Sequence, residues 1–220
     1  MRWSEFRKLC IFILGLVGFL GCVSKPPSLL PPQTPGAGEW SAKAQITDQK
    51  TGKSQQVNLS IMGIWPDQLR LEARAILGIS VGTLTLQKDD FAVLLPRQHK
   101  FFQGHASEKI LQSVFQLPVD PHWLLDLAFD QPLPNPEFNC VFEQGRLKRC
   151  QRPSDGLTIE WRDRDSGRRR VVISAAQHEL QIVFLDFSEW DPTKVQEILS
   201  NPHSPFRLTA PDGFTNYNVR

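Results

Sequence analysis

The four cysteines are the residues of this 220-residue chain whose chemistry depends most on their placement. Cys140 and Cys150 flank a segment predicted to form a hairpin that turns around Gly145. In that hairpin the two thiols face each other across the strands, close enough for a disulfide, which an oxidising compartment favours. The alternative is two unpaired or metal-binding thiols, although the chain has no second pair to complete a zinc site.

Other patterns that would indicate catalysis or metal binding are missing from the sequence. The five histidines show no His-Glu-x-x-His spacing, and no Gly-x-Ser-x-Gly sequence is present. Residues 163–167 contain two aspartates but lack the third acidic ligand and the distal glutamate of a calcium loop, so a polar hairpin turn explains them better. We therefore expect a protein that is not an enzyme and that needs no metal and no cofactor.

The N-terminal segment has the organisation of a cleavable leader. Basic residues precede an apolar run over residues 10–20, which is shorter than the about 20 residues of a membrane-spanning helix but suits a signal-peptide core. The run ends in Phe-Leu-Gly-Cys at residues 19–22, which resembles the lipobox of bacterial lipoprotein precursors with phenylalanine in place of the usual leucine. The resemblance implies that residues 1–21 are removed and that Cys22 carries a lipid. The alternative is an ordinary secreted protein, although no Ala-x-Ala-like site is present.

The segment after the predicted cleavage site is dense in proline. Residues 22–38 therefore favour an extended, semi-rigid tether, which would join the lipidated cysteine to a single domain over residues 39–220. Residue 23 is valine, not the aspartate that keeps lipoproteins at the inner membrane in well-studied sorting systems. By resemblance, this implies a lipid-anchored protein of the outer membrane that faces the periplasm.

The charge of the chain excludes one class of partner. The formal net charge is +2, and the basic residues of the predicted signal peptide supply that excess. The mature chain is then close to neutral, and its net charge does not favour binding to nucleic acid.

Period-two alternation of apolar and polar residues dominates from Trp40 onward, and clusters of Gly, Pro, Asp and Asn interrupt it. This pattern is typical of an antiparallel meander with one buried face. The predicted strands cover residues 57–61, 69–75, 81–86, 91–95, 99–102, 139–142, 157–162, 170–174, 179–187 and 206–214.

Three short helices are predicted among these strands. One follows Ser107, a second covers residues 121–129 after the capping residue Asp120, and a third follows Asp191. A long sheet and a few amphipathic helices must bury their apolar faces together, so we expect the helices on the concave side of a curved sheet. The expected fold is mainly β with α, a half-open antiparallel β-barrel covered by a few short helices.

Three stretches resemble the LolA/LolB-type lipoprotein carriers and receptors, and LolB-like lipoproteins most. Residues 69–78 match a strand that runs into a Pro-Leu-Gly loop, with Ile76 in place of proline. Residues 104–133 combine a small helix, Leu-Pro-Val and Trp-Leu-Leu, and residues 206–214 resemble a final strand with a Pro-x-Gly turn. The likeness spans nearly all of residues 39–214 and depends on the order of the pieces.

The resemblance implies a function as well as a fold. It implies an apolar cavity for acyl chains, with membrane lipid, acylated lipoproteins and a periplasmic carrier as partners. In the receptors the leucine before the loop glycine protrudes and delivers cargo into the membrane, and Leu77, between Ile76 and Gly78, is the matching residue. The alternative is that Leu77 ends a strand and packs inward.

Large apolar residues of the helical region are the candidates for the cavity wall. The same residue types at the same spacing are equally compatible with an ordinary filled core. A structural or interaction lipoprotein with a closed core is therefore the alternative function. The candidates are Phe101, Phe115, Trp123, Leu124 and Leu127.

Six basic residues lie on two predicted hairpins. They suit contact with lipid phosphates, and they equally suit a solvated strand face. These residues are Arg146, Lys148, Arg149, Arg168, Arg169 and Arg170.

The leader assignment makes a testable prediction. Changing Cys22→Ser should leave the precursor uncut by the lipoprotein signal peptidase and unable to incorporate labelled palmitate. One acyl chain binds a membrane only marginally, so stable anchoring implies more than one chain on Cys22. Undiminished palmitate labelling of the variant would falsify the assignment.

Overall fold

The computed structural model describes residues 36–115, 119–133, 135–164 and 168–219. The predicted leader, Cys22 and most of the tether lie outside these residues. The strands are β1 (Ala37–Asp48), β2 (Ser54–Ile64), β3 (Gln68–Arg74), β4 (Ser80–Gln87), β5 (Asp90–Leu95), β6 (Lys100–His105), β7 (Asn139–Glu143), β8 (Arg146–Gln151), β9 (Thr158–Arg162), β10 (Arg170–Ser174), β11 (His178–Glu189) and β12 (Thr215–Val219). The helices are η1 (Pro96–Gln98), α2 (Glu108–Phe115), α3 (Pro121–Ala128) and α4 (Pro192–Ser200).

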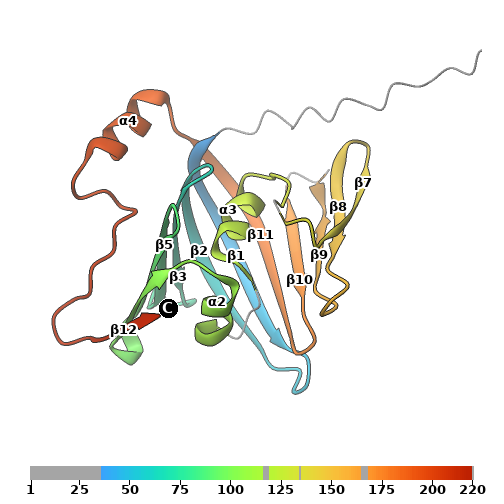
Figure 1. The fold of residues 1–220 in the computed structure, drawn as a ribbon, viewed down its shortest axis with the longest axis horizontal. Helices are drawn as coiled ribbons and strands as arrows, with labels where there is room; N and C mark the ends of the chain where they lie inside the picture. Colours follow the sequence, from blue (N-terminus) through green and yellow to red (C-terminus); the bar gives the residue numbers. More distant parts are fainter. Residues whose placement is uncertain (1–35, 116–118, 134, 165–167, 220) are drawn as a thin grey trace, which may run out of the picture. The chain divides into compact units, whose positions relative to one another are not determined.

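All twelve strands belong to one sheet, in the order β12-β6-β5-β4-β3-β2-β1-β11-β10-β9-β8-β7. Neighbouring strands run antiparallel from β6 through to β7, and β12 is added parallel to β6. The two meanders β1–β6 and β7–β11 meet where β1 pairs with β11, the two longest strands. The edge strands β12 and β7 do not pair with each other, so the curved sheet does not close into a barrel (Figure 1). The predicted half-open antiparallel barrel is confirmed.

The concave face of the sheet holds the main core, and α2 and α3 lie within its curve (Figure 1). Alternation of burial along the strands produces this face: on β11, Leu180, Ile182 and Phe184 are buried and their neighbours are less so. Both helices belong to the connection between β6 and β7, so this one connection covers the concave face. Within the described residues no helix is long and apolar enough to cross a membrane.

Helix α3 packs directly on the sheet. Asp120 caps it by accepting a hydrogen bond from the His122 backbone N–H, and proline follows the cap as predicted. Gly63 of β2 makes the close approach possible, because a Cβ at this position would lie 2.6 Å from the Phe129 ring and 2.8 Å from Leu125. All positions of the helix except His122 are buried.

The prediction that the third helix also covers the concave face is wrong. Helix α4 has no buried residue, and it lies apart from α2 and α3 (Figure 1). Its half-buried Val195 and Ile198 pack on a small second cluster of Ala37, Trp190 and Phe206. The helix carries too few apolar side chains to form a wall of the main core.

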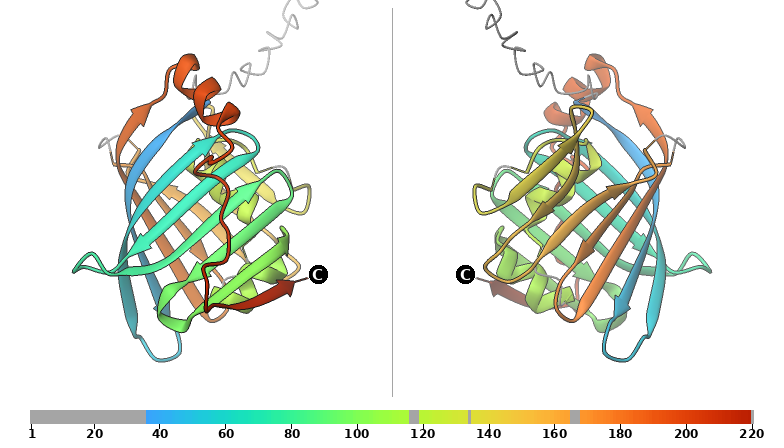
Figure 2. Two further views of the ribbon diagram at one scale, coloured as in Figure 1. Left: turned by 90° about the vertical axis from the view of Figure 1, so that its left-hand side faces the viewer. Right: turned by 90° about the vertical axis from the view of Figure 1, so that its right-hand side faces the viewer.

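The predicted last strand over residues 206–214 is also wrong. This segment forms turns, and it crosses the outer face of the sheet as the dark red strap in Figure 2. Phe206 is buried against Trp190 and not in a strand ladder, and Pro211 with Gly213 produces a turn. The final strand is instead β12, which follows that turn.

The domain begins earlier than predicted. Strand β1 starts at Ala37, inside the segment 22–38 that was predicted as tether. The reason is the register with β2, which pairs Ala37 with Ile64 and Gly38 with Gly63, so both residues belong to the sheet.

One buried acid lies on α3. The Asp126 carboxylate accepts a hydrogen bond from the Trp65 indole N–H at 3.1 Å. Burial, the largest influence, raises the pKa of Asp126 to about 6, and the Trp65 hydrogen bond opposes the shift only in part. Because this pKa lies above that of an unfolded aspartate, Asp126 disfavours the folded state at neutral pH, and the penalty is relieved as the pH falls from about 7 to about 4.

We predict that Asp126→Asn, which keeps the acceptor for Trp65, stabilises the protein by about 2–3 kcal/mol at pH 7–8. The difference from the wild type should vanish near pH 4, where both side chains are neutral. Urea unfolding across this pH range measures it. If the free energies of unfolding of the two proteins differ by the same amount at every pH, ionisation of Asp126 does not destabilise the folded state, and the prediction is wrong.

Candidate functional site

An apolar cavity of about 110 Å³ lies between the concave face and α2. Five strands contribute described residues to its wall, together with Leu111 of α2, Leu124 of α3 and Val119 just before α3. Thr83 is the one lining side chain that contains a polar atom. The wall consists of Ala44, Ile46, Val57, Leu59, Leu71, Ala73, Val81, Gly82, Thr83, Leu84, Leu111, Val119, Leu124, Leu180 and Ile182.

Small residues on adjacent strands explain why this part of the core is not filled. Ala44 of β1 is the direct register partner of Val57 on β2 and Ile182 on β11. Ala73 of β3 is likewise the register partner of Leu59 on β2 and of Gly82 on β4. The side chains of Ala44 and Ala73 are too short to reach the helices, so the space above them stays open. An empty apolar cavity of this volume costs about 2–3 kcal/mol relative to a filled core.

The cavity has its mouth at one end of the sheet. The half-buried lining residues Ile46, Val57, Ala73 and Val81 all lie within a few residues of the strand ends that join the β1–β2 and β3–β4 turns. The remaining lining residues on neighbouring strands lie deeper and are mostly buried. The β3–β4 turn starts two residues after Ala73 and ends two residues before Val81, so it borders the mouth.

That turn carries the exposed apolar residues identified in the sequence. Leu77 is 87% exposed and Ile76 is 77% exposed, with Ile79 also exposed. The turn is closed by hydrogen bonds from the Ala75 N–H to the Ile79 carbonyl and from the Gly78 N–H to the Ala75 carbonyl. Figure 2 shows it projecting from the side of the sheet as a blue-green hairpin end. The alternative that Leu77 packs inward is therefore wrong.

The structure places one of the predicted wall residues at the cavity. Leu124 lines the cavity, whereas Phe101, Trp123 and Leu127 are buried in the filled part of the core. The side chain of Phe115 lies outside the described residues. Helix α3 is buried on nearly all sides, so helical spacing alone does not show which of its side chains face the hollow.

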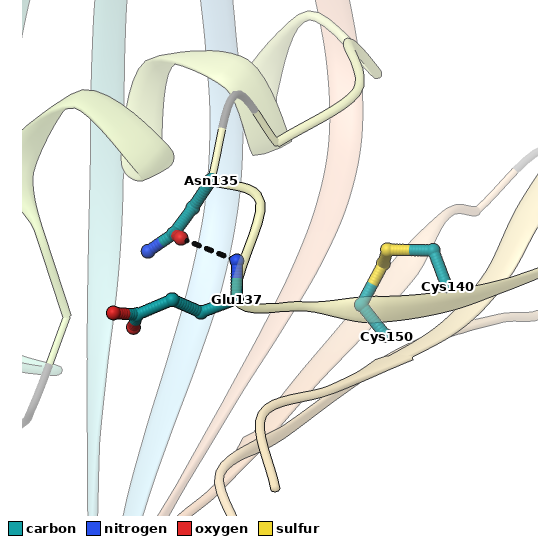
Figure 3. Close-up of a disulfide and its surroundings, with 4 residues drawn as sticks. All are labelled: Asn135, Glu137, Cys140 and Cys150. Carbon is teal, nitrogen blue, oxygen red and sulfur yellow. Dashed lines mark hydrogen bonds between the residues drawn. A yellow bond between two sulfur atoms is a disulfide. The ribbon is translucent and has the colours of Figure 1, made fainter. Parts of the chain in front are cut away.

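The disulfide lies at the far end of the sheet from β12. Cys140 of β7 and Cys150 of β8 are direct register partners and are joined by a disulfide (Figure 3). Just before β7, the Asn135 side chain accepts a hydrogen bond from the Glu137 backbone N–H at 2.9 Å and shapes the turn into the strand. The bond fastens the edge hairpin of the sheet.

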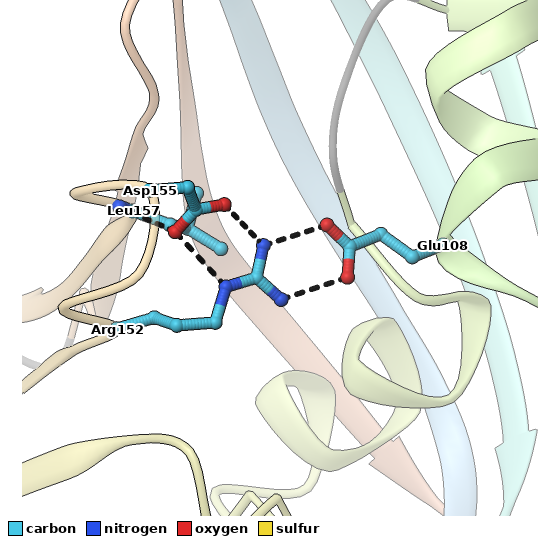
Figure 4. A network of polar contacts seen from close by, with 4 residues as sticks. All are labelled: Glu108, Arg152, Asp155 and Leu157. Atoms are coloured by element: carbon cyan, nitrogen blue, oxygen red, sulfur yellow. Dashed lines mark hydrogen bonds and ion pairs between the residues drawn. The ribbon is translucent and has the colours of Figure 1, made fainter.

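An ionic cluster that sequence reasoning missed attaches α2. Arg152, buried after β8, donates two hydrogen bonds of 2.7 Å to Glu108 in the first turn of α2 (Figure 4). Its Nε also donates to Asp155 at 3.0 Å, and its guanidinium lies 5.6 Å from the ring centres of Trp123 and Phe138. The hydrogen bonds to Glu108 and Asp155 raise the pKa of Arg152, so the cluster stays charged. The sequence separation of 44 between Glu108 and Arg152 explains why no local pattern indicated the cluster.

Within the described residues no group of three or more His, Cys, Asp and Glu side chains is placed to hold a metal ion. The cavity presents almost entirely apolar side chains, so it offers a ligand apolar surface.

No known protein family and no curated protein matches the sequence. Among solved structures, a LolA superfamily protein from Nitrosomonas europaea is similar, with 9% identity over 72% of this chain and 89% of that chain, at a TM-score of 0.47. A candidate outer-membrane lipoprotein-sorting domain from Vibrio parahaemolyticus shows 6% identity over 74% and 91% of the chains, at a TM-score of 0.38.

Proposed function

We propose that this protein binds acyl chains of lipids or lipoproteins in the cavity under α2, as a binding protein and not an enzyme. The observation that supports the proposal most is the position of the mouth. An almost wholly apolar cavity opens beside a turn whose Ile76 and Leu77 side chains are exposed. Isolated exposed apolar residues are ordinary, but three in five residues at the rim of an apolar cavity form a continuous path for a hydrocarbon chain.

The volume limits what the cavity holds in this state. Ligand pockets typically measure roughly 300–1,000 Å³, so about 110 Å³ accepts only part of an acyl chain. Each buried methylene contributes about 0.8 kcal/mol, and three or four of them offset the cost of the hollow. A longer chain requires α2 to move outward. Among the described side chains of α2, Leu111 lines the wall.

The exposed turn suits brief contact with a bilayer. Inserting Leu77 into hydrocarbon contributes roughly 1.5–3 kcal/mol, which is too little for permanent attachment and enough to guide a chain between membrane and cavity. Permanent attachment would come from the lipid proposed on Cys22. Together these features suit a lipid-anchored protein of the outer membrane that faces the periplasm and receives lipid or lipoprotein chains from a carrier.

The cavity is tested by filling it. We predict that Ala44→Leu abolishes binding of a fluorescent fatty acid and does not lower the stability, because the added carbons occupy the existing space. The matched control is Ala175→Leu, since Ala175 packs on the same core but does not line the cavity. This control should bind the probe like the wild type. A wild-type protein that takes up no probe would favour the closed-core alternative.

The turn is tested by charging it. Because Leu77 is almost fully exposed, Leu77→Glu should change the free energy of unfolding by no more than about 0.5 kcal/mol. It should nevertheless abolish transfer of acyl chains to liposomes, because a carboxylate does not enter hydrocarbon. Fluorescence of the labelled chain in the liposomes measures the transfer.

Leu199→Glu is the matched control, because Leu199 is an exposed leucine on α4. This variant should transfer chains at the wild-type rate. If Leu77→Glu transfers chains as well as the control does, the turn has no part in the function.

A further inference from the structure

A second pocket lies where β8 and β9 separate. The ladder between them covers only residues 149–151 of β8 and 158–160 of β9. The first part of β8, residues 146–148, belongs to the hairpin with β7 and does not pair with β9. The gap between the two strands is a pocket of about 330 Å³. It is separate from the apolar cavity and shares no lining residue with it.

Basic side chains outnumber acidic ones on the walls of this pocket. Arg146 and Lys148 come from the β7–β8 hairpin, and Arg162 and Arg164 come from the end of β9 and the residues after it. The sequence singled out the first two, but it missed the second two, which come near them only because the strands part. The rest of the lining is Glu143, Gln144, Leu147, Trp161 and Asp163.

The acids around the pocket are already engaged. Glu143 pairs with Lys148 at 2.7 Å, and Asp163 pairs with Arg170 at 3.0 Å. Arg146 is exposed and has neither a hydrogen-bond nor an ion-pair partner among the described residues. One positive charge at the rim is therefore not neutralised.

Arg164 belongs to an ion-pair group that contains a second arginine, Arg169, which does not line the pocket. Asp130 accepts two hydrogen bonds from Arg164, at 2.9 and 2.6 Å, and also lies 3.8 Å from Arg169. One carboxylate thus serves two arginines that are only 13% exposed. The Nε of Arg164 is buried without a hydrogen-bond partner. Burial lowers the pKa of Arg164, the charge of Asp130 opposes this shift, and the nearby charge of Arg146 lowers the pKa further.

From this arrangement we infer that the pocket between β8 and β9 binds a phosphate group. Arginine side chains on two facing walls match a tetrahedral anion that presents acceptor oxygens in several directions. The excess positive charge and the partial burial strengthen such contacts relative to open solvent. The phosphate is either the headgroup of a lipid or a free phosphate, because both present the same oxygens. The inference does not depend on what the cavity holds.

The test uses Arg146→Gln, which removes the unpaired charge from an exposed position without breaking an ion pair. Two probes are titrated with the purified protein: inorganic phosphate, followed by calorimetry, and phosphatidylcholine vesicles with and without phosphatidic acid, followed by co-sedimentation. We expect the variant to weaken phosphate binding about tenfold or more, the loss that fits one charge-assisted hydrogen bond. Arg149→Gln is the control, because Arg149 lies on the same hairpin and does not line the pocket.

The two probes distinguish the sources. Binding of inorganic phosphate that depends on Arg146 and not on Arg149 identifies a site for free phosphate. Binding confined to vesicles with phosphatidic acid, with the same dependence, identifies a lipid headgroup. Equal weakening by both variants would show attraction to the general surface charge, and it would overturn the inference, as would no binding to either probe.

Discussion

The structure depends on one packing constraint, which is that a twelve-stranded curved sheet has a single concave apolar face and two helices of eight residues to cover it. Helix α3 packs closely on the strands, because Gly63 lets it approach, and of its side chains Leu124 faces the cavity. Helix α2 covers the remaining width, and the strands beneath it carry Ala44, Ala73 and Gly82. The cavity lies where the cover is short and the strand residues are small.

The same constraint explains how α2 is held. A helix above a hollow gains less from apolar contact than one on a filled core, since a gap removes the contacts on one side. Arg152 compensates by joining Glu108 on α2 to Asp155 on the β8–β9 turn. Among the described contacts of α2, the ion pair between Glu108 and Arg152 is thus one attachment, and buried Leu111 is another.

Much of the fold was predictable because its signals are local. Period-two alternation located the antiparallel strands, and Asp120 and Asp191 with their following prolines marked the starts of α3 and α4. The register of the β7–β8 hairpin, and with it the Cys140–Cys150 pair, follows from the turn at Gly145.

The errors arise where distant segments decide the outcome. The place of α4 and the parallel pairing of β12 depend on which surface remains free once the sheet has formed. The position of the cavity depends on small residues that meet across strands, such as Ala73 beside Gly82, and no single strand shows that pattern. The exposure of Leu77 was left open by the sequence, because a turn of apolar residues packs inward or outward depending on the space beside it.

The central claim is that the cavity under α2 accepts a hydrocarbon chain. Mass spectrometry of protein purified gently from the cells that produce it tests this most directly. The account predicts a lipid or acylated molecule that leaves the protein on denaturation, in addition to any covalent lipid on Cys22. Protein that carries no such molecule, and that takes none up when mixed with palmitate, would show that the hollow is only a packing defect of the core.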